Sequence, residues 1–334
     1  MKELLTIEIG GYFGLDLLNY GDLFPLYLKY QSARSALRAV LEHVKATKML
    51  LPAYICNSVI QAVIDAGVTP KFYYLDEDLF PKNLPDDNSD NFLLYINYFG
   101  LNDHNVKKLQ HVWPNDKLII DNSQALFAQP TGAIATIYSP RKFVGVPDGG
   151  MLYAPTLSMI EPDEEDTESI VRMRHLLIRA AYSARSGYSD YLAAEQTLEK
   201  TKPLAMSKIT RRLLSSVNLQ GIKTKRRENF QVISDMLNHY NSISLRLEPD
   251  TVPLCYPLIL TGYDVEQMKN KMIQNNIFVP TYWQEVLSRV DEGSFEYSIV
   301  NNCLSLPCDQ RYGEVVMNEI IVSIEKMLDG DKLK

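Results

Sequence analysis

Short apolar runs alternate with helix-like segments through the first half of the chain. Three segments, 32–44, 57–67 and 103–112, carry apolar residues at helical spacing, with Ser32 as a candidate N-cap and Gly67 as a candidate C-cap. Strands are expected where the runs are continuously apolar, at 48–54, 71–76, 92–100, 117–122, 133–138 and 150–154. This alternation predicts a three-layer α/β/α arrangement, with a mostly parallel sheet between two layers of helices.

The second half of the chain has a different pattern. From 162 to about 240 the spacing is helical and rich in Arg, Lys and Glu, without strand signals, which predicts long helices. Beyond it, strands are expected near 252–260 and 303–307, and helices near 264–275 and 313–328. We therefore expect a large domain at 1–240 and a smaller C-terminal α/β domain at 241–334.

Composition and charge narrow the function classes. The 334 residues are 46% hydrophobic and 22% charged, with a net charge of −7, as in soluble globular proteins without a basic face for nucleic acid or membrane. The basic run 223–229 is short and helical, so we interpret it as a solvated helix face. The four cysteines form no CxxC pair and the five histidines do not cluster with them, so no metal site is expected. Without a signal peptide or an apolar span, the chain is expected in the cytoplasm with reduced thiols.

Candidate chemistry gathers where strands are expected to end. Tyr54, Asn97, Asp121 and Lys142 all follow apolar runs, and ligands of such sheets bind at the carboxyl ends of the strands. Taken singly, Asp121 is as well explained by a turn or a helix cap, and Lys142 by a solvated side chain. Lys142, however, lies among apolar residues and precedes a Pro-Asp-Gly-Gly turn, and an amine desolvated in this way is a competent nucleophile.

An Asp and a Lys at neighbouring strand ends suit pyridoxal 5′-phosphate (PLP). The Lys would form the Schiff base with the cofactor, and the Asp would keep the pyridine nitrogen protonated so that the ring accepts electrons. The phosphate requires backbone N–H groups at a helix N-terminus, which the segment "QSARSAL" (31–37) would supply. An ordinary capped helix explains that segment equally well.

The order of these motifs resembles the fold-type I PLP-dependent enzymes, and among them the DegT/StrS-like sugar aminotransferases. The resemblance runs from about 27 to 328, through "SARSAL", "LPAYICNSVIQAVIDAG", "NYFG", "IIDNSQALF" and "YSPRKFVGVPDGG". It implies a PLP-transferase-like fold with Lys142 as the Schiff-base lysine. It further implies a set of cofactor-binding residues, which are Asp121 at the pyridine nitrogen, Gln124 near the phenolic oxygen, Ser32, Ala33 and Arg34 at the phosphate, and Asn97 beside the ring.

The chain departs from the family pattern at several positions. Ala33 and Arg34 replace a Gly-Thr pair, and Cys56 stands where an aromatic residue usually stacks on the ring, with Tyr54 as a substitute next to it. Ile137 replaces a Ser five residues before the Lys, which leaves Ser139 or Thr136 for the phosphate. Pro203 and Ala205 replace an Asn and an Arg that reach the neighbouring subunit's site.

The resemblance implies an aminotransferase that moves an amino group from an amino acid donor, glutamate above all, to a keto-sugar, with nucleotide-linked sugars as the expected acceptors. It also implies a homodimer. Two alternatives stay open, a PLP enzyme of another reaction type such as a dehydratase, and a non-catalytic descendant of the fold. A nicotinamide-dependent dehydrogenase is disfavoured because no GxGxxG follows a strand.

Overall fold

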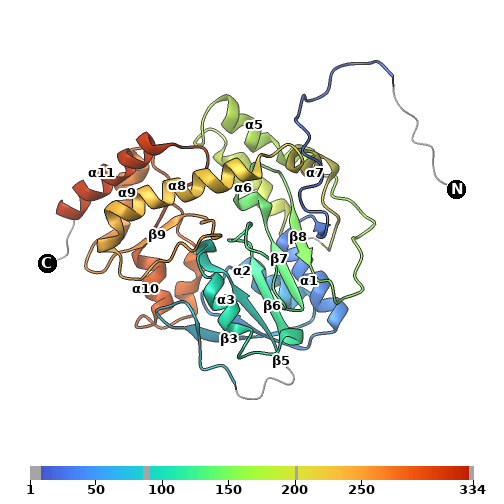
Figure 1. Ribbon diagram of the computed structural model, residues 1–334, viewed down its shortest axis with the longest axis horizontal. Helices are drawn as coiled ribbons and strands as arrows, with labels where there is room; N and C mark the ends of the chain where they lie inside the picture. The colour runs from blue at the N-terminus through green and yellow to red at the C-terminus, as the bar shows by residue number, and fades with distance from the viewer. Residues whose placement is uncertain (1–8, 86–90, 200–201, 331–334) are drawn as a thin grey trace.

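A mixed sheet forms the centre of the larger part of the molecule (Figure 1). The computed structural model describes residues 9–85, 91–199 and 202–330. Within them, the sheet has the strand order β1-β8-β7-β6-β5-β2-β3-β4, where the strands are β1 (Leu28–Tyr30), β2 (Lys48–Pro52), β3 (Thr69–Leu75), β4 (Pro81–Lys82), β5 (Asn91–Ile96), β6 (Leu118–Asn122), β7 (Ala135–Tyr138) and β8 (Gly150–Tyr153). The five strands from β3 to β7 in this order run parallel, and β8, β1 and β4 pair antiparallel at the two sides. The predicted mostly parallel sheet is confirmed.

Helices α1 (Ala33–Val44) and α2 (Asn57–Asp65) lie side by side, α1 against β7 and β8 and α2 against β3. Helix α1 begins at the predicted cap, because the Ser32 side chain accepts a hydrogen bond from the Ser35 amide. Its buried face carries Leu37 and Leu41 one turn apart, as the helical spacing predicts. A shorter helix, α3 (Asp103–Leu109), connects β5 to β6.

The long-helical prediction for 162–240 is only partly correct. Its described residues form one long helix, α8 (Leu219–Leu237), after four short ones, which are α4 (Ser169–Arg172), α5 (Arg174–Ala181), α6 (Tyr188–Thr197) and α7 (Lys208–Leu214). Helix α7 begins at Ser207, whose side chain caps the Thr210 amide. An isolated bridge joins Ala205 to Tyr30, so this segment also contacts the edge strand β1, which the apolar pattern did not predict.

The C-terminal part is an α/β unit built on an antiparallel pair of strands, β9 (Tyr256–Ile259) and β10 (Cys303–Leu306). Its helices are α9 (Val265–Gln274), α10 (Phe295–Asn302) and α11 (Glu314–Gly330), and α8 packs against α11 (Figure 1). All four elements expected here are present, with strands shorter than the apolar runs. The 3-10 helices among the described residues are η1 (Tyr98–Gly100), η2 (Asn115–Lys117), η3 (Pro140–Lys142), η4 (Asn238–Tyr240) and η5 (Gln284–Ser288).

The basic run on α8 is not only a solvated face. Arg226 is 2% exposed, and its guanidinium donates to the carbonyls of Pro253 and Leu254 at 3.2 and 3.0 Å. The prediction holds for Lys225, which pairs with Glu228 at the surface. Arg226 differs because its guanidinium points into the molecule, where the carbonyls of Pro253, Leu254 and Phe143 need a donor. No helix in the described ranges is long and apolar enough to cross a membrane.

Candidate active site

A cavity of about 410 Å³ brings together most of the predicted site residues. It lies where β6 and β7 end, beside the beginnings of α1 and α2. The strand residues Leu94, Ile96 and Ile137 form an apolar part of its wall. The predicted residues that line it are Ser32, Ala33, Arg34, Cys56, Asp121, Gln124, Ser139 and Lys142.

Asp121 and Gln124 are delivered by the end of β6 and the turn after it. Asp121 is buried, and one of its carboxylate oxygens accepts a hydrogen bond from the Ser123 amide at 2.8 Å. The Gln124 carbonyl oxygen accepts from the Phe99 amide at 2.6 Å, whereas its Nε2 is buried without any partner. A buried amide donor without a partner is costly, so Gln124 Nε2 is poised for an acceptor on a ligand.

Lys142 ends η3, a short turn that follows β7. The residues after it, Phe143 and Val144, are buried as the sequence predicts, and they anchor the turn in an apolar cluster with Tyr138 and Met206. The Lys142 side chain itself is exposed at the cavity, which corrects the expectation that apolar groups enclose it. Its ammonium has no hydrogen bond or ion pair within the described chain. The amine is therefore available to a ligand.

The beginning of α1 closes the cavity beside Lys142. Gly149 donates its amide to the Gln31 carbonyl at 2.5 Å, so the Gly-Gly turn lies directly against this helix end. Gly149 has a φ of +124°, which a residue with a side chain rarely adopts. Because the first turn of a helix leaves N–H groups without intrahelical partners, the end formed by Ser32, Ala33 and Arg34 suits an anion.

Two predicted residues do not line the cavity. Asn97 donates its side-chain amide to Asp103 at 2.6 Å and to Asn122 at 3.3 Å, and these contacts hold it beneath the strand ends. Tyr54 is 1% exposed and its ring stacks on Tyr98 with 5.5 Å between centroids. The sequence placed both residues correctly at strand ends, but it could not tell to which side each side chain points.

Among the other residues that line the cavity, sequence reasoning missed the charged and aromatic ones, which are Arg141, Tyr191, Glu195 and Trp283. Arg141 forms an ion pair with Glu195 of α6, and its Nε is buried without a partner. Arg141 directly precedes Lys142 in "YSPRKFVGVPDGG", and this adjacency is the sequence signal that points to it. Tyr191 and Glu195 lie in a helix without a local signal, and Trp283 ends the segment "FVPTYW" (278–283), far along the chain.

The cavity residue Arg34 carries part of the positive charge at this end of the site. Burial lowers the pKa of its guanidinium, against the opposite effects of the Cys56 thiol and the Glu195 carboxylate nearby. The guanidinium also donates to the Leu198 carbonyl at 3.3 Å. Arg34 and Arg141 thus face one carboxylate, Glu195, which leaves an excess of cationic groups next to the start of α1.

The segment 203–207 lies behind the Gly-Gly turn of its own chain. Ala205 bridges to Tyr30 and Glu165, and Ser207 donates both its amide and its hydroxyl to Asp148 at 2.9 Å. Pro203 and Ala205 line no part of the cavity. In this chain the segment supports the turn after Lys142 from the outside.

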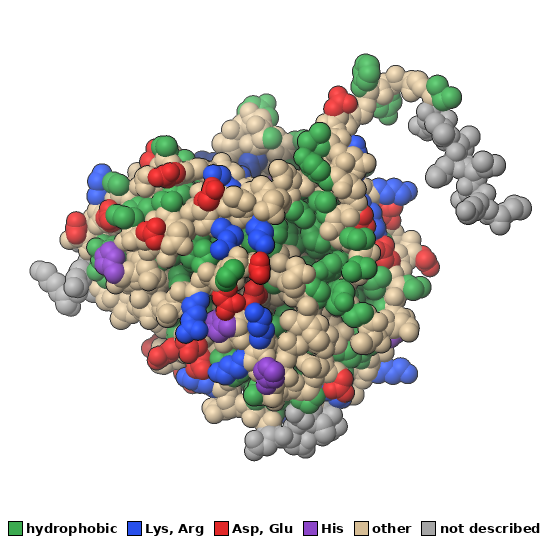
Figure 2. Space-filling model, in the orientation of Figure 1, with side chains coloured by type: hydrophobic (Ala, Val, Ile, Leu, Met, Phe, Trp, Pro, Cys, Tyr) green, Lys and Arg blue, Asp and Glu red, His purple; other side chains and the backbone are tan. Residues whose placement is uncertain are grey.

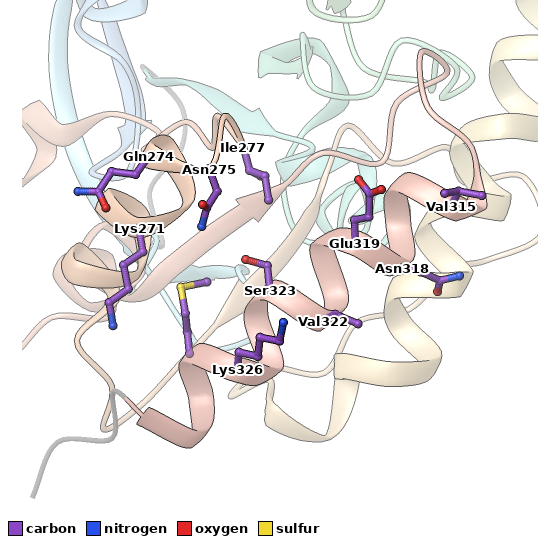
Figure 3. Close-up of a pocket in the computed structure, with 11 residues that line it drawn as sticks. Lys271, Gln274, Asn275, Ile277, Val315, Asn318, Glu319, Val322, Ser323 and Lys326 are labelled. Atoms are coloured by element: carbon purple, nitrogen blue, oxygen red, sulfur yellow. The ribbon is translucent and has the colours of Figure 1, made fainter.

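A second hollow, of about 770 Å³, lies between α9 and α11 in the C-terminal part (Figure 3). Lys271 and Gln274 of α9 and Glu319 and Ser323 of α11 are among the residues that line it. None of the predicted site residues lines it. Although it is larger than the cavity at the strand ends, it gathers no convergent set of catalytic groups.

Comparison with known proteins agrees with this architecture. No family model and no curated protein matches the sequence. Among solved structures, the sugar aminotransferase CalS13 from Micromonospora echinospora is similar, with 12% identity, coverage of 90% of this chain and 87% of that one, and a TM-score of 0.64. A DegT DnrJ EryC1 StrS aminotransferase from Brucella abortus has 14% identity, coverage of 90% and 85%, and a TM-score of 0.61.

A dehydratase shares the architecture as well. The GDP-4-keto-6-deoxy-D-mannose-3-dehydratase of E. coli, solved with bound hydrated PLP, has 13% identity, coverage of 89% and 87%, and a TM-score of 0.60. At such identities the likeness concerns the fold, and one fold carries several reactions. The chain has the fold of the DegT/DnrJ/EryC1/StrS-type sugar aminotransferases, as its sequence motifs predict.

Proposed function

We propose that this protein is a PLP-dependent aminotransferase that moves an amino group from an amino acid donor, with glutamate as the expected donor, to a nucleotide-linked keto-sugar. One observation carries the proposal. The carboxylate of Asp121, the unpartnered amide of Gln124 and the unpaired amine of Lys142 line the same cavity at the carboxyl ends of parallel strands.

The cavity fits the cofactor at each of its polar groups. Asp121 would hold the protonated pyridine nitrogen, and Gln124 Nε2 would gain the acceptor that it lacks by donating to the ring's phenolic oxygen. The start of α1 with Ser32, together with Arg34 and Arg141, would bind the phosphate, so a second arginine takes the place of the missing serine hydroxyl.

Lys142 and Asp121 would have different roles in the reaction. When bound, PLP supplies an electron sink that stabilises negative charge on the substrate carbon bearing the amino group. Lys142 Nζ would hold the cofactor, and it would then take the proton from that carbon and return it. Asp121 would face the ring nitrogen as its hydrogen-bond and charge partner. The exposed position of Lys142 leaves its amine free to move between these two tasks.

The experiment is cofactor fixation. The purified protein, incubated with PLP, should absorb in the visible range, and sodium borohydride should fix the cofactor on Lys142, located by peptide mass spectrometry. Lys142→Ala should abolish the fixation, whereas Lys208→Ala, at an exposed lysine that does not line the cavity, should retain it. A protein that takes up no PLP, or that is labelled elsewhere, would overturn the proposal.

Dehydration is the second candidate reaction. It is favoured by the likeness to the E. coli dehydratase and by the loss of the Asn and Arg at positions 203 and 205, which alters the substrate half of the site. Glutamate separates the two reactions, because an amino donor converts the bound cofactor of an aminotransferase and changes its visible absorption. If no amino acid changes the absorption although PLP is fixed on Lys142, the dehydratase is the better assignment.

We also propose a cytoplasmic homodimer, with a domain boundary near 240. An arm of the chain, residues 9–16, leaves the body and carries exposed apolar side chains (Figures 1 and 2). Tyr12 and Phe13 in it are 98% and 99% exposed. Helix α6 exposes Tyr188 and Leu192 beside the cavity residue Tyr191. A second copy of the chain would cover such surfaces and complete the wall of the site.

A further inference from the structure

Two aromatic residues line the cavity, Tyr191 of α6 and Trp283, and Trp283 comes from the C-terminal part of the chain, next to the position of Cys56. We propose that its indole is the surface on which the pyridine ring of PLP stacks, in place of any residue between 54 and 56. The inference rests on the proposed function, because it assigns one more contact to the same cofactor. Neither Cys56 nor the buried Tyr54 can offer an aromatic face there.

The backbone at Trp283 is held in a conformation that a bulky residue rarely adopts. Its φ of 58° and ψ of 56° lie in the left-handed region, where a side chain crowds the chain. Such conformations persist where surrounding contacts over-determine them, and they concentrate at ligand sites. Trp283 N-caps η5 and its carbonyl accepts the Val286 amide at 2.9 Å, which fixes the turn.

The side chains of Glu285 and Arg289, which follow Trp283 in the chain, connect its segment to the start of α2 at the edge of the cavity. Glu285 accepts the Asn57 amide at 2.9 Å, at the first residue of α2. Arg289 donates to the Ile55 carbonyl at 2.9 Å and to the Asn57 side chain at 2.5 Å. These contacts bracket Cys56, the position at which a stacking aromatic residue is expected. The C-terminal segment therefore delivers an aromatic ring to the place where the local chain has a thiol.

Tyr54 supports the indole from behind. The two rings meet edge to face, with 4.7 Å between centroids and an interplanar angle of 65°. Tyr98 stacks on Tyr54 and also meets the indole edge to face, with 6.2 Å between centroids. Trp283 nevertheless remains partly exposed and lines the cavity. The indole is thus oriented by a buried aromatic pair and keeps uncovered surface toward the ligand, as a stacking partner requires.

The chain offers a direct spectroscopic test, because Trp113 and Trp283 are its only two tryptophans. Trp113 is buried beyond the end of α3 and does not line the cavity. In Trp113→Phe the emission comes from Trp283 alone, and in Trp283→Phe from Trp113 alone. Titration with PLP should strongly quench the tryptophan fluorescence of Trp113→Phe and quench that of Trp283→Phe much less. The reason is that quenching by ring contact and by energy transfer both weaken as the distance between tryptophan and cofactor grows.

Affinity gives an independent readout. Trp283→Phe keeps an aromatic face, so its dissociation constant for PLP should be within about twofold of that of the native protein. Trp283→Leu should bind PLP about two- to tenfold more weakly, because an aromatic pair contributes about that much affinity beyond its buried area. Circular dichroism checks that the Leu variant folds. At saturating PLP, borohydride should still fix the cofactor on Lys142 in each variant.

The outcomes separate the two proposals. Equal quenching of both tryptophans, or a Leu variant that binds PLP as tightly as the Phe variant, overturns the role of Trp283 while leaving fixation on Lys142 intact. A Leu variant with native PLP affinity and a raised KM for substrate alone also overturns it, since Trp283 would then contact substrate. If the native protein neither binds PLP nor becomes labelled, both proposals fail together.

Discussion

Gly150 lies directly against the backbone of Ser32. A Cβ placed on Gly150 would come within 2.1 Å of the Ser32 carbonyl carbon and within 2.3 Å of the Ala33 amide nitrogen. The glycine pair that follows Lys142 in the sequence is therefore a contact between β8 and the start of α1. It brings the turn after Lys142 and the proposed phosphate site together, because only a residue without a side chain permits so close an approach.

Gly150→Ala should therefore damage both the fold and the cofactor site. The added methyl group cannot be accommodated without moving the start of α1, and we expect the free energy of unfolding to fall by about 1–3 kcal/mol or more. PLP affinity should fall with it. Gly145→Ala is the matched control, since its nearest neighbour is a Leu176 side-chain atom at 3.6 Å. Denaturant unfolding and PLP titration of both variants measure the effect, and equal behaviour would contradict it.

Asp148 should make stability depend on pH. Burial raises its pKa from 3.8 to about 6, against hydrogen bonds from Ser207 that lower it. The folded protein thus holds this proton more tightly than the unfolded chain. The resulting stabilisation is complete below pH about 4 and is lost as the pH rises to about 6, by about 3 kcal/mol in total, since one pK unit is about 1.4 kcal/mol.

Asp148→Asn isolates this contribution, because the amide oxygen can still accept from Ser207 and Thr210 while the group no longer titrates. The free energy of unfolding of the native protein minus that of the variant should decrease between pH 4 and pH 6. Above pH 6.5 this difference should be constant. A difference that rises over the same range would show that the pKa of Asp148 is lowered by folding.

Gln310 should position the turn that carries Lys142. Its Nε2 donates to the Phe143 carbonyl at 2.7 Å, and its Oε1 accepts from Arg226 at 2.9 Å. Gln310→Ala leaves a buried carbonyl and a buried guanidinium short of partners, so we expect a loss of about 1–3 kcal/mol in unfolding free energy. Borohydride fixation on Lys142 should also become slower. Gln231→Ala, at the exposed side of α8, should change neither quantity.

The sequence predicted the sheet, its parallel centre and the grouping of Asp121, Gln124 and Lys142, because these follow from apolar runs and from the polar residues that end them. It missed what depends on side-chain direction and on contacts between distant segments. Asn97 ends a strand as predicted but bonds Asp103 instead of facing the cavity. Trp283 lies more than a hundred residues from Lys142, and periodicity carries no information on such a pairing.

Asp121→Asn should separate binding from chemistry. The neutral side chain can still accept the Ser123 amide, so the fold should be unchanged. It cannot hold a proton on the pyridine nitrogen by charge, and we expect turnover to fall about a hundredfold or more, as when a preorganised electrostatic contact is removed. Single-turnover absorbance changes with glutamate measure the step. A variant that reacts at the native rate would show that Asp121 does not face the ring nitrogen.

Removal of the arm should weaken self-association without unfolding the chain. Deletion of residues 1–16 keeps Leu17 and Tyr20, whose backbones bond Arg212 at 2.9 Å and Ser215 at 2.7 Å, so the remaining segment stays attached to the body. Tyr12 and Phe13 alone would remove about 300–500 Å² from water on docking. That is a large share of the roughly 800 Å² per partner of a stable interface.

Sedimentation velocity over a range of concentrations measures the result, and the dissociation constant of the truncated dimer should be at least about tenfold higher than that of the full chain. The double substitution of Tyr12 and Phe13 by Ser should act in the same direction. Val315→Ser, at an exposed apolar position on α11, serves as the control and should leave association unchanged. A truncated protein that sediments like the full chain would place the dimer contact elsewhere, and a full chain that is monomeric would contradict the proposed homodimer itself.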